Sequence, residues 1–172
     1  MERESSKILV EEHKNILKVV EALSKEIEQG KDIDEKFFRS VIDFIRNYAD
    51  KFHHAKEEDI LFKEFGKCAE EGDVHCNPVE QMLFEHDEGR NFVKGMEEAL
   101  EKKDKGKLIL NARGYINLIQ EHIFKEDTIL FPMVDDALNK ETEKEMLTKF
   151  KEIAKKNKNE EEKHLNFIRD LS

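Results

Sequence analysis

The fold is decided by a stretch that reads His53-His54-Ala55-Lys56-Glu57-Glu58-Asp59-Ile60-Leu61-Phe62. The pattern returns later in the chain as His122-Ile123-Phe124-Lys125-Glu126-Asp127-Thr128-Ile129-Leu130-Phe131, and both copies read His-x-x-Lys-Glu-x-x-Ile-Leu-Phe. Histidine and glutamate are four residues apart in each copy, so they share one face of a helix. Two copies are too few for a repeat architecture. We therefore predict two helices that supply equivalent halves of one site.

The composition favours helices throughout. Of the 172 residues, 38% are hydrophobic and 41% are charged, a ratio that suits long helices with one buried stripe. Two prolines and seven glycines leave few turns, and alternating β-branched runs are hard to find. The length suits one domain with a core of useful size. We predict an all-α fold.

The charge and the amino-terminal sequence disfavour a nucleic-acid-binding protein and a membrane protein. A formal net charge of −10 disfavours binding to nucleic acid and to an anionic membrane surface. The chain starts with charged residues and no long apolar segment follows, so we expect neither a signal peptide nor a membrane span. A cytoplasmic protein is the expectation.

Apolar spacing and helix-end signals divide the chain into four long helices and a charged tail. The expected helices cover residues 5–29, 34–65, 78–103, 107–138 and, in the tail, 140 onward. We predict that residues 1–138 form an up-down-up-down antiparallel four-helix bundle. Residues 139–172 are predicted to add a C-terminal helix, packed on the bundle or on a partner, and a homodimer is one such arrangement.

Local signals predict where these helices end or bend. Gly30 and Gly66 are expected to end the first two helices. Pro132 is expected to kink the last turns of the fourth helix, where Ile129 continues the apolar stripe. The tail helix is expected to break near residues 157–159.

Five of the seven histidines and two glutamates lie on or beside the apolar stripes of the four main helices. They are His13, His53, His54, Glu57, His86, His122 and Glu126. A lone histidine on such a stripe is usually a hydrogen-bonded core residue, but here every helix carries one. Burying these groups unpaired is costly, and a shared metal removes the penalty. Their distances from the helix ends place them in one layer of the bundle.

The donor set predicts the kind of metal. Glu57 projects between His53 and His54, so it is placed to bridge two ions. Five imidazoles, two bridging carboxylates and an oxo or hydroxo bridge fill about eleven of twelve octahedral positions, which leaves one open. Zinc prefers four ligands, and manganese and magnesium prefer more oxygen. We predict two non-haem iron ions.

The pattern His13, His53-x-x-x-Glu57, His86, His122-x-x-x-Glu126 resembles the hemerythrin family. It is most similar to the hemerythrin-like, or HHE cation-binding, branch, over residues 8–136. The motifs that carry the resemblance are His53-His54-x-Lys56-Glu57-Glu58, Glu85-His86-Asp87-Glu88-Gly89-Arg90, and Glu121-His122-x-x-Lys125-Glu126 followed by Leu130-Phe131-Pro132. The resemblance implies oxygen binding, oxygen or iron sensing, iron storage, or handling of peroxide or nitric oxide.

The chain departs from the oxygen carriers of that family. They place two histidines four apart on the third helix, whereas here Met82 and Arg90 lie four residues from His86. His54 restores the nitrogen count. Reversible oxygen carriage is thereby put in doubt, while a di-iron site is still expected.

Other site types are less well supported. Ferritin-type bundles use Glu-x-x-His on two helices, and the pattern occurs here only at Glu161-x-x-His164, in the tail. We expect His75 and His164 to be surface residues. Cys68 and Cys76 are expected to be free thiols, and a small metal site with His75 is the less favoured reading.

We expect the site to bind or sense a small diatomic ligand, dioxygen or nitric oxide. No general acid or base stands apart from the ligand set, because Tyr48 points away and Tyr115 lies too far from the centre for direct contact. An enzyme that handles peroxide or nitric oxide, and an iron storage or sensing protein, are the alternatives. A helical interaction module with incidental histidines is the simplest alternative.

Overall fold

The computed structural model describes residues 3–30, 32–70 and 77–171, and these ranges contain helices and no strand. Their bounds are α1 Glu4–Glu28, α2 Glu35–Phe44, η1 Ile45–His54, η2 Glu57–Leu61, α3 Phe62–Glu70, α4 Val79–Glu101, α5 Lys105–Lys125, η3 Glu126–Leu130, α6 Phe131–Ala137 and α7 Lys140–Asp170. The labels η1 to η3 mark π-helical segments. The prediction of an all-helical fold is confirmed.

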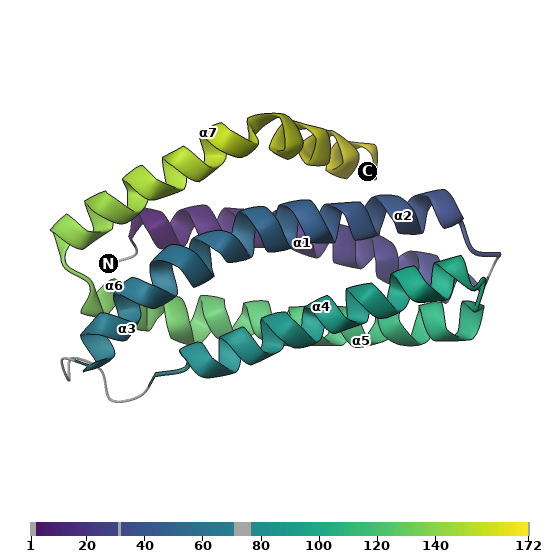
Figure 1. Cartoon of the computed structure of the whole chain (residues 1–172), viewed down its shortest axis with the longest axis horizontal. Coiled ribbons are helices and arrows are strands. Elements are labelled where there is room, and N and C mark those ends of the chain that lie inside the picture. Colours follow the sequence, from purple (N-terminus) through teal and green to yellow (C-terminus); the bar gives the residue numbers. More distant parts are fainter. Residues whose placement is uncertain (1–2, 31, 71–76, 172) are drawn as a thin grey trace.

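The long helices lie side by side along the long axis of the molecule (Figure 1). The segments α2, η1, η2 and α3 follow one another as one continuous rod, and α5, η3 and α6 form another. α4 packs along α5, α1 contacts α5 and η1, and α7 covers α1, η1 and η2. No helix in the described ranges is both long enough and apolar enough to cross a membrane.

Side-chain caps fix the starts of three helices. The carboxylate of Asp34 accepts a hydrogen bond from the backbone N–H of Phe37 at the start of α2. Asp104 does the same for α5, and Asn139 accepts two such bonds at the start of α7. These caps satisfy N–H groups that have no partner within the helix. At the other end of α1, Gly30 adopts a φ of 63°, which glycine tolerates without strain.

The apolar core is divided into two clusters. On α1, Leu9 belongs to one cluster and Ile16 to the other, so His13 lies between the two. On α4, Met82 and Val93 flank His86 in the same way. The polar layer is therefore sealed above and below by packed apolar side chains.

The π-helical segments are not predicted by the sequence periodicity. η1 ends at His54, η2 begins at Glu57, and η3 begins at Glu126. The irregularity expected at Pro132 is the segment η3, which precedes the proline. Pro132 itself is the second residue of α6, directly after η3. Because the wider π turn changes the helix phase, Ile129 is 50% exposed, and its predicted place on the buried stripe is wrong.

Two predicted helix breaks are also wrong. The second rod continues through Gly66 to Glu70, and α7 continues through residues 157–159. At the second position, the side chain of Asn157 donates a hydrogen bond to the carbonyl of Ile153, one turn back, within the helix. Neither Gly66 nor Asn157 therefore ends a helix here.

α7 packs on its own chain. Its side chains Met146, Phe150 and Ile168 are buried in the two core clusters. His164 is also buried, against the rings of Phe44 and Tyr48. The expectation of a surface position for His164 is thus wrong, because α7 turns this face towards the bundle.

Candidate metal centre

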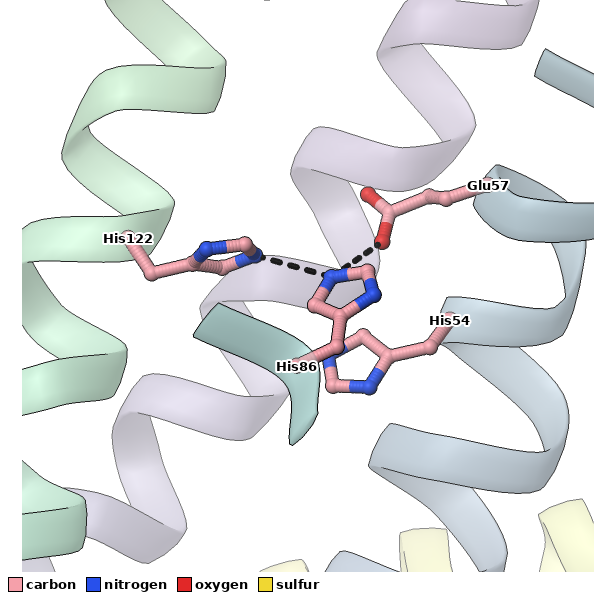
Figure 2. Close-up of side chains that lie close together, drawn as sticks. All are labelled: His54, Glu57, His86 and His122. Carbon is pink, nitrogen blue, oxygen red and sulfur yellow. Dashed lines mark hydrogen bonds and ion pairs between the residues drawn. The ribbon is translucent and has the colours of Figure 1, made fainter. Parts of the chain in front are cut away.

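The structure brings all seven predicted site residues together in two overlapping groups. One group contains His54, Glu57, His86 and His122, and the other contains His13, His53, Glu57 and Glu126. Within each group the candidate ligand atoms all lie within 4.8 Å of one another, and every residue is buried. Glu57 belongs to both groups. Figure 2 shows the first group converging from three helical rods.

Glu57 and Glu126 each connect the two groups. Glu57 does so with its two carboxylate oxygens, and Glu126 does so with one oxygen that faces two histidines. Oε1 of Glu57 lies 3.3 Å from Nε2 of His53, and Oε2 lies 3.5 Å from Nε2 of His86. Oε2 of Glu126 lies 3.2 Å from Nε2 of His13 and 3.3 Å from Nε2 of His122. Each carboxylate therefore faces imidazoles of both groups.

Each of the five histidines turns its Nδ1 atom towards a carboxylate and its other edge towards the centre. The pairs are His13–Asp127 at 2.7 Å, His53–Glu12 at 2.9 Å, His54–Asp50 at 3.4 Å, His86–Glu58 at 2.7 Å and His122–Glu85 at 2.8 Å. An ionised carboxylate only accepts, so Nδ1 donates. The lone pair is then left on Nε2, the tautomer that a metal ligand needs.

These five carboxylates were missed in the sequence, although a signal exists for most of them. Glu12 and Glu85 directly precede inward histidines, and Glu58 and Asp127 directly follow the inward glutamates. Each contacts a histidine on a different helical rod from its own. The motif therefore contains the ligands and the groups that orient ligands on neighbouring helices.

The lysine of the repeated motif completes this arrangement. Lys56 pairs with Glu12, and Lys125 pairs with Glu85. The Lys56 side chain is only 2% exposed, whereas that of Lys125 is 33% exposed. The ammonium group of Lys56 lies 3.5 Å from the ring centroid of Phe52 and 5.9 Å from that of Phe150, which α7 supplies. The two halves of the centre therefore have the same lysine–glutamate pairing, but the two lysines differ in their exposure to solvent.

The buried atoms at the centre fit a bound cation. Nε2 of His13 and of His53, and all four carboxylate oxygens of Glu57 and Glu126, have no hydrogen-bond partner among the described residues. Nε2 of His86 and Nε2 of His122 lie 3.0 Å apart, with both Nδ1 atoms already engaged. Lone pairs that face one another in a buried site are costly unless a proton or a metal lies between them.

The electrostatics of the site show how strongly it favours positive charge. Burial opposes protonation of His53 and His122, but the carboxylates of Glu57 and Glu126 outweigh it and raise the pKa of each imidazole to about 10. Burial also disfavours ionised Glu126, yet His122 and His13 hold its pKa well below the usual range. A metal would replace the protons that these carboxylates otherwise attract.

His54 has a different environment from the other ligands. Burial, together with the nearby His86, holds its pKa well below the ordinary value. Its ring stacks on that of His86 with centroids 3.8 Å apart (Figure 2). His54 is therefore a neutral imidazole, which is the form that binds metals.

The remaining sequence predictions concern residues outside the centre. Tyr48 was expected to point away from the centre; it is buried, and its hydroxyl accepts a hydrogen bond from Asn15. Arg90 pairs with Asp50 and Glu58 instead of facing the centre. Sγ of Cys68 lies 3.9 Å from the carbonyl of Ala137. His75 and Cys76 lie outside the described residues, so the expectations about them remain predictions.

Comparison with known proteins agrees with this geometry. The family model described as the hemerythrin HHE cation binding domain matches residues 5–134. No match to a curated protein or to a solved structure was found. The matched range contains all seven converging residues and ends before α7. The chain therefore belongs to the family of hemerythrin HHE cation-binding domains.

Proposed function

We propose that the protein holds two non-haem iron ions and uses them to bind or sense a small diatomic ligand, dioxygen or nitric oxide. The observation that carries this proposal is the pair of overlapping ligand groups that share Glu57. Two groups with a common carboxylate call for two ions with a common bridge. Glu126, which faces His13 and His122, is the second bridging carboxylate.

The donor types support iron over other metals. Five imidazoles and two carboxylates offer no thiolate and too many ligands for tetrahedral zinc. They offer more nitrogen than magnesium or manganese prefers. Iron accepts this mixture in six-coordinate geometry, with an oxo or hydroxo bridge between the ions.

The two groups are unequal in nitrogen, and this supports ligand binding at one ion. His54, His86 and His122 supply three imidazoles to one group, while His13 and His53 supply two to the other. A metal ion held by His13 and His53 would therefore have fewer protein nitrogen ligands and more room for a small ligand. On this side the ring of Phe131 stacks on that of His13, with centroids 5.5 Å apart, and supplies an apolar surface next to the centre.

We propose the following helix arrangement for the chain. For the domain of residues 1–138, the described helices form an up-down-up-down antiparallel four-helix bundle that places ligands from all four rods at one depth. In the extension of residues 139–172, α7 covers the face next to Lys56. The contacts of α4 with α5, of α1 with α5, and of α7 with α1 support this description.

The test is to reduce the iron-loaded protein without air and then admit oxygen. Binding predicts a charge-transfer absorption band that forms in proportion to the iron and disappears on degassing. Rapid bleaching with gas evolution from added peroxide would instead favour an enzyme. Absence of iron from protein purified without chelator would overturn the proposal.

A further inference from the structure

A cavity of about 140 Å³ lies beside the group formed by His54, His86 and His122. Those three histidines form part of its wall, and Gly89, Arg90 and Tyr115 form further parts. An engineered cavity of about 150 Å³ is large enough for benzene or xenon. The space therefore has room for a molecule of a few heavy atoms, next to the centre.

The cavity exists on this side because of one glycine. Gly89 follows His86 by three residues, as Ile16 follows His13 by three residues on α1. Ile16 is buried and fills its side of the core, whereas Gly89 offers no side chain. A Cβ atom at Gly89 would lie 3.7 Å from side-chain carbons of both Leu118 and Tyr115, which line the cavity. The first atom of a side chain therefore fits, and a longer side chain would occupy the cavity.

A buried polar group in the cavity wall has no partner. The hydroxyl of Tyr115 makes no hydrogen bond to any described residue. Burial and the charge of Asp50 raise the pKa of Tyr115, so the hydroxyl keeps its proton. An unsatisfied buried hydroxyl is costly, and a ligand with an acceptor atom would satisfy it.

The mouth of the cavity is bordered by paired charges. Arg90, on α4, donates to Asp50 at 2.7 Å and to Glu58 at 2.6 Å, and so spans from α4 to η1 and η2. Arg46 pairs with Glu97. Because these guanidinium groups are neutralised, they offer little attraction to an anion. The side chains of Ile45, Val93, Leu118 and Ile119 make much of the wall apolar. Two further charged residues line it: Lys51 donates a hydrogen bond to Asn47, and Glu85 pairs with Lys125.

We infer that this cavity is a holding site for a small uncharged molecule with an acceptor atom, to which Tyr115 donates a hydrogen bond and over which Arg90 is a latch. The inference rests on the proposed function, since the molecule held there is the ligand on its way to the metal centre. Diatomic gases and hydrogen peroxide belong to this class. The holding site borders His54, His86 and His122, and Glu57 connects this group to the one that contains His13 and His53.

Arg90 also connects the latch to the ligands. Its two partners, Asp50 and Glu58, are the carboxylates that accept from His54 and His86. Movement of the Arg90 side chain would therefore shift the carboxylates that orient two histidines of the same group, His54 and His86. Opening of the mouth and orientation of these imidazoles are mechanically linked.

Metal-free crystals pressurised with xenon, or soaked with acetonitrile, test the holding site without any reaction at iron. Both probes are expected in the wild-type cavity. Gly89→Ile, which copies the residue on α1, should abolish both, and Gly66→Ile is the matched control at a helical glycine with open space around it. Tyr115→Phe should keep xenon and lose acetonitrile. An empty wild-type cavity, or equal probe occupancy in Gly89→Ile, would overturn the inference.

A smaller substitution guards against misfolding of Gly89→Ile. Gly89→Ala adds only the atom that the site accommodates, and it should lower xenon occupancy without abolishing it. For the latch, Arg90→Ala should speed xenon exchange between cavity and solvent several-fold by xenon NMR, whereas Arg39→Ala, at a remote exposed ion pair, should not. Unchanged exchange in Arg90→Ala would remove the latch from the proposal.

Iron analysis of the protein as purified without chelator, before the metal is removed for crystallisation, separates the two proposals. Missing iron together with bound xenon contradicts the proposed function but not the cavity. Bound iron together with a cavity that excludes both probes contradicts only the inference drawn from the cavity.

Discussion

The carboxylate of Glu12 lies 2.9 Å from Nδ1 of His53, on another helix, although its sequence neighbour His13 is itself a candidate ligand. His13 in turn donates to Asp127, on a third helical rod. Each helix therefore orients the ligands of its neighbours as well as supplying its own. The centre and the helix packing are consequently expected to depend on each other.

Glu12→Gln is expected to weaken metal binding although Glu12 is not a ligand. The amide cannot hold the His53 imidazole as a carboxylate does, and Lys56 loses its partner. Loss of such an orienting group typically costs roughly 10–100-fold in affinity. Competition with a chelator measures the change, and Glu11→Gln, at an exposed neighbour that pairs with Lys14, is the control. Equal affinities in the two variants would show that orientation through Glu12 is unimportant.

His54→Ala is expected to lower the affinity for one of two ions. The group with His86 and His122 loses a nitrogen, while the group with His13 and His53 keeps all its donors. Metal bound per chain should then fall towards one at limiting metal. His164→Phe changes a buried histidine outside the centre and should leave metal content unchanged. A wild-type metal content in His54→Ala would mean that His54 is not a ligand.

Removal of the metal is expected to lower Tm. A ligand present at a hundred times its Kd stabilises the folded state by about 2.7 kcal/mol. For a chain of this size, 1 kcal/mol shifts Tm by roughly 2–4 °C, so chelation should lower Tm by roughly 5–10 °C. Calorimetry with and without chelator measures this shift. A Tm that does not respond to chelator would contradict binding at the buried centre.

Docking of α7 is expected to weaken in acid because of His164. Burial lowers the pKa of this imidazole from its ordinary value of 6.5, and Lys163 lowers it further, against the opposing effects of Asp43 and Glu160. As pH falls below 6.5, the unfolded segment takes up a proton before the folded one does. The stabilising contribution is therefore complete above pH 6.5 and is lost as pH falls towards the lower folded-state pKa.

Hydrogen exchange along α7, measured above and below pH 6.5, tests this prediction. Protection of the amides near His164 should decrease in acid, after correction for the intrinsic exchange rate. His164→Phe, which cannot take up the proton, should show a much smaller decrease. Equal pH dependence in the two proteins would assign the effect to other groups.

Much of the site was predictable because its residue types are rarely placed on apolar stripes. Histidine at 13, 53, 86 and 122 sits where a helix period of 3.6 directs side chains inward, and the structure brings them together. His54 was predicted as a ligand because Glu57 projects between His53 and His54 on the same helix. These positions follow from local geometry, which the sequence carries directly.

The missed features depend on packing between segments. The π turns at η1, η2 and η3 add residues to a turn, and periodicity analysis assumes a constant turn. The partners of His13 and His86 lie on other helices, so sequence distance gives no direct measure of them. Burial of His164 depends on how α7 docks, which an amphipathic pattern alone does not fix.

The central claim is that two ions share the carboxylate of Glu57. Anomalous diffraction at the iron edge, from crystals of protein loaded with iron, tests it most directly. The account predicts two peaks per chain, one next to His54, His86 and His122 and the other next to His13 and His53, with Glu57 between them. A single peak, or iron bound only at surface carboxylates, would contradict it.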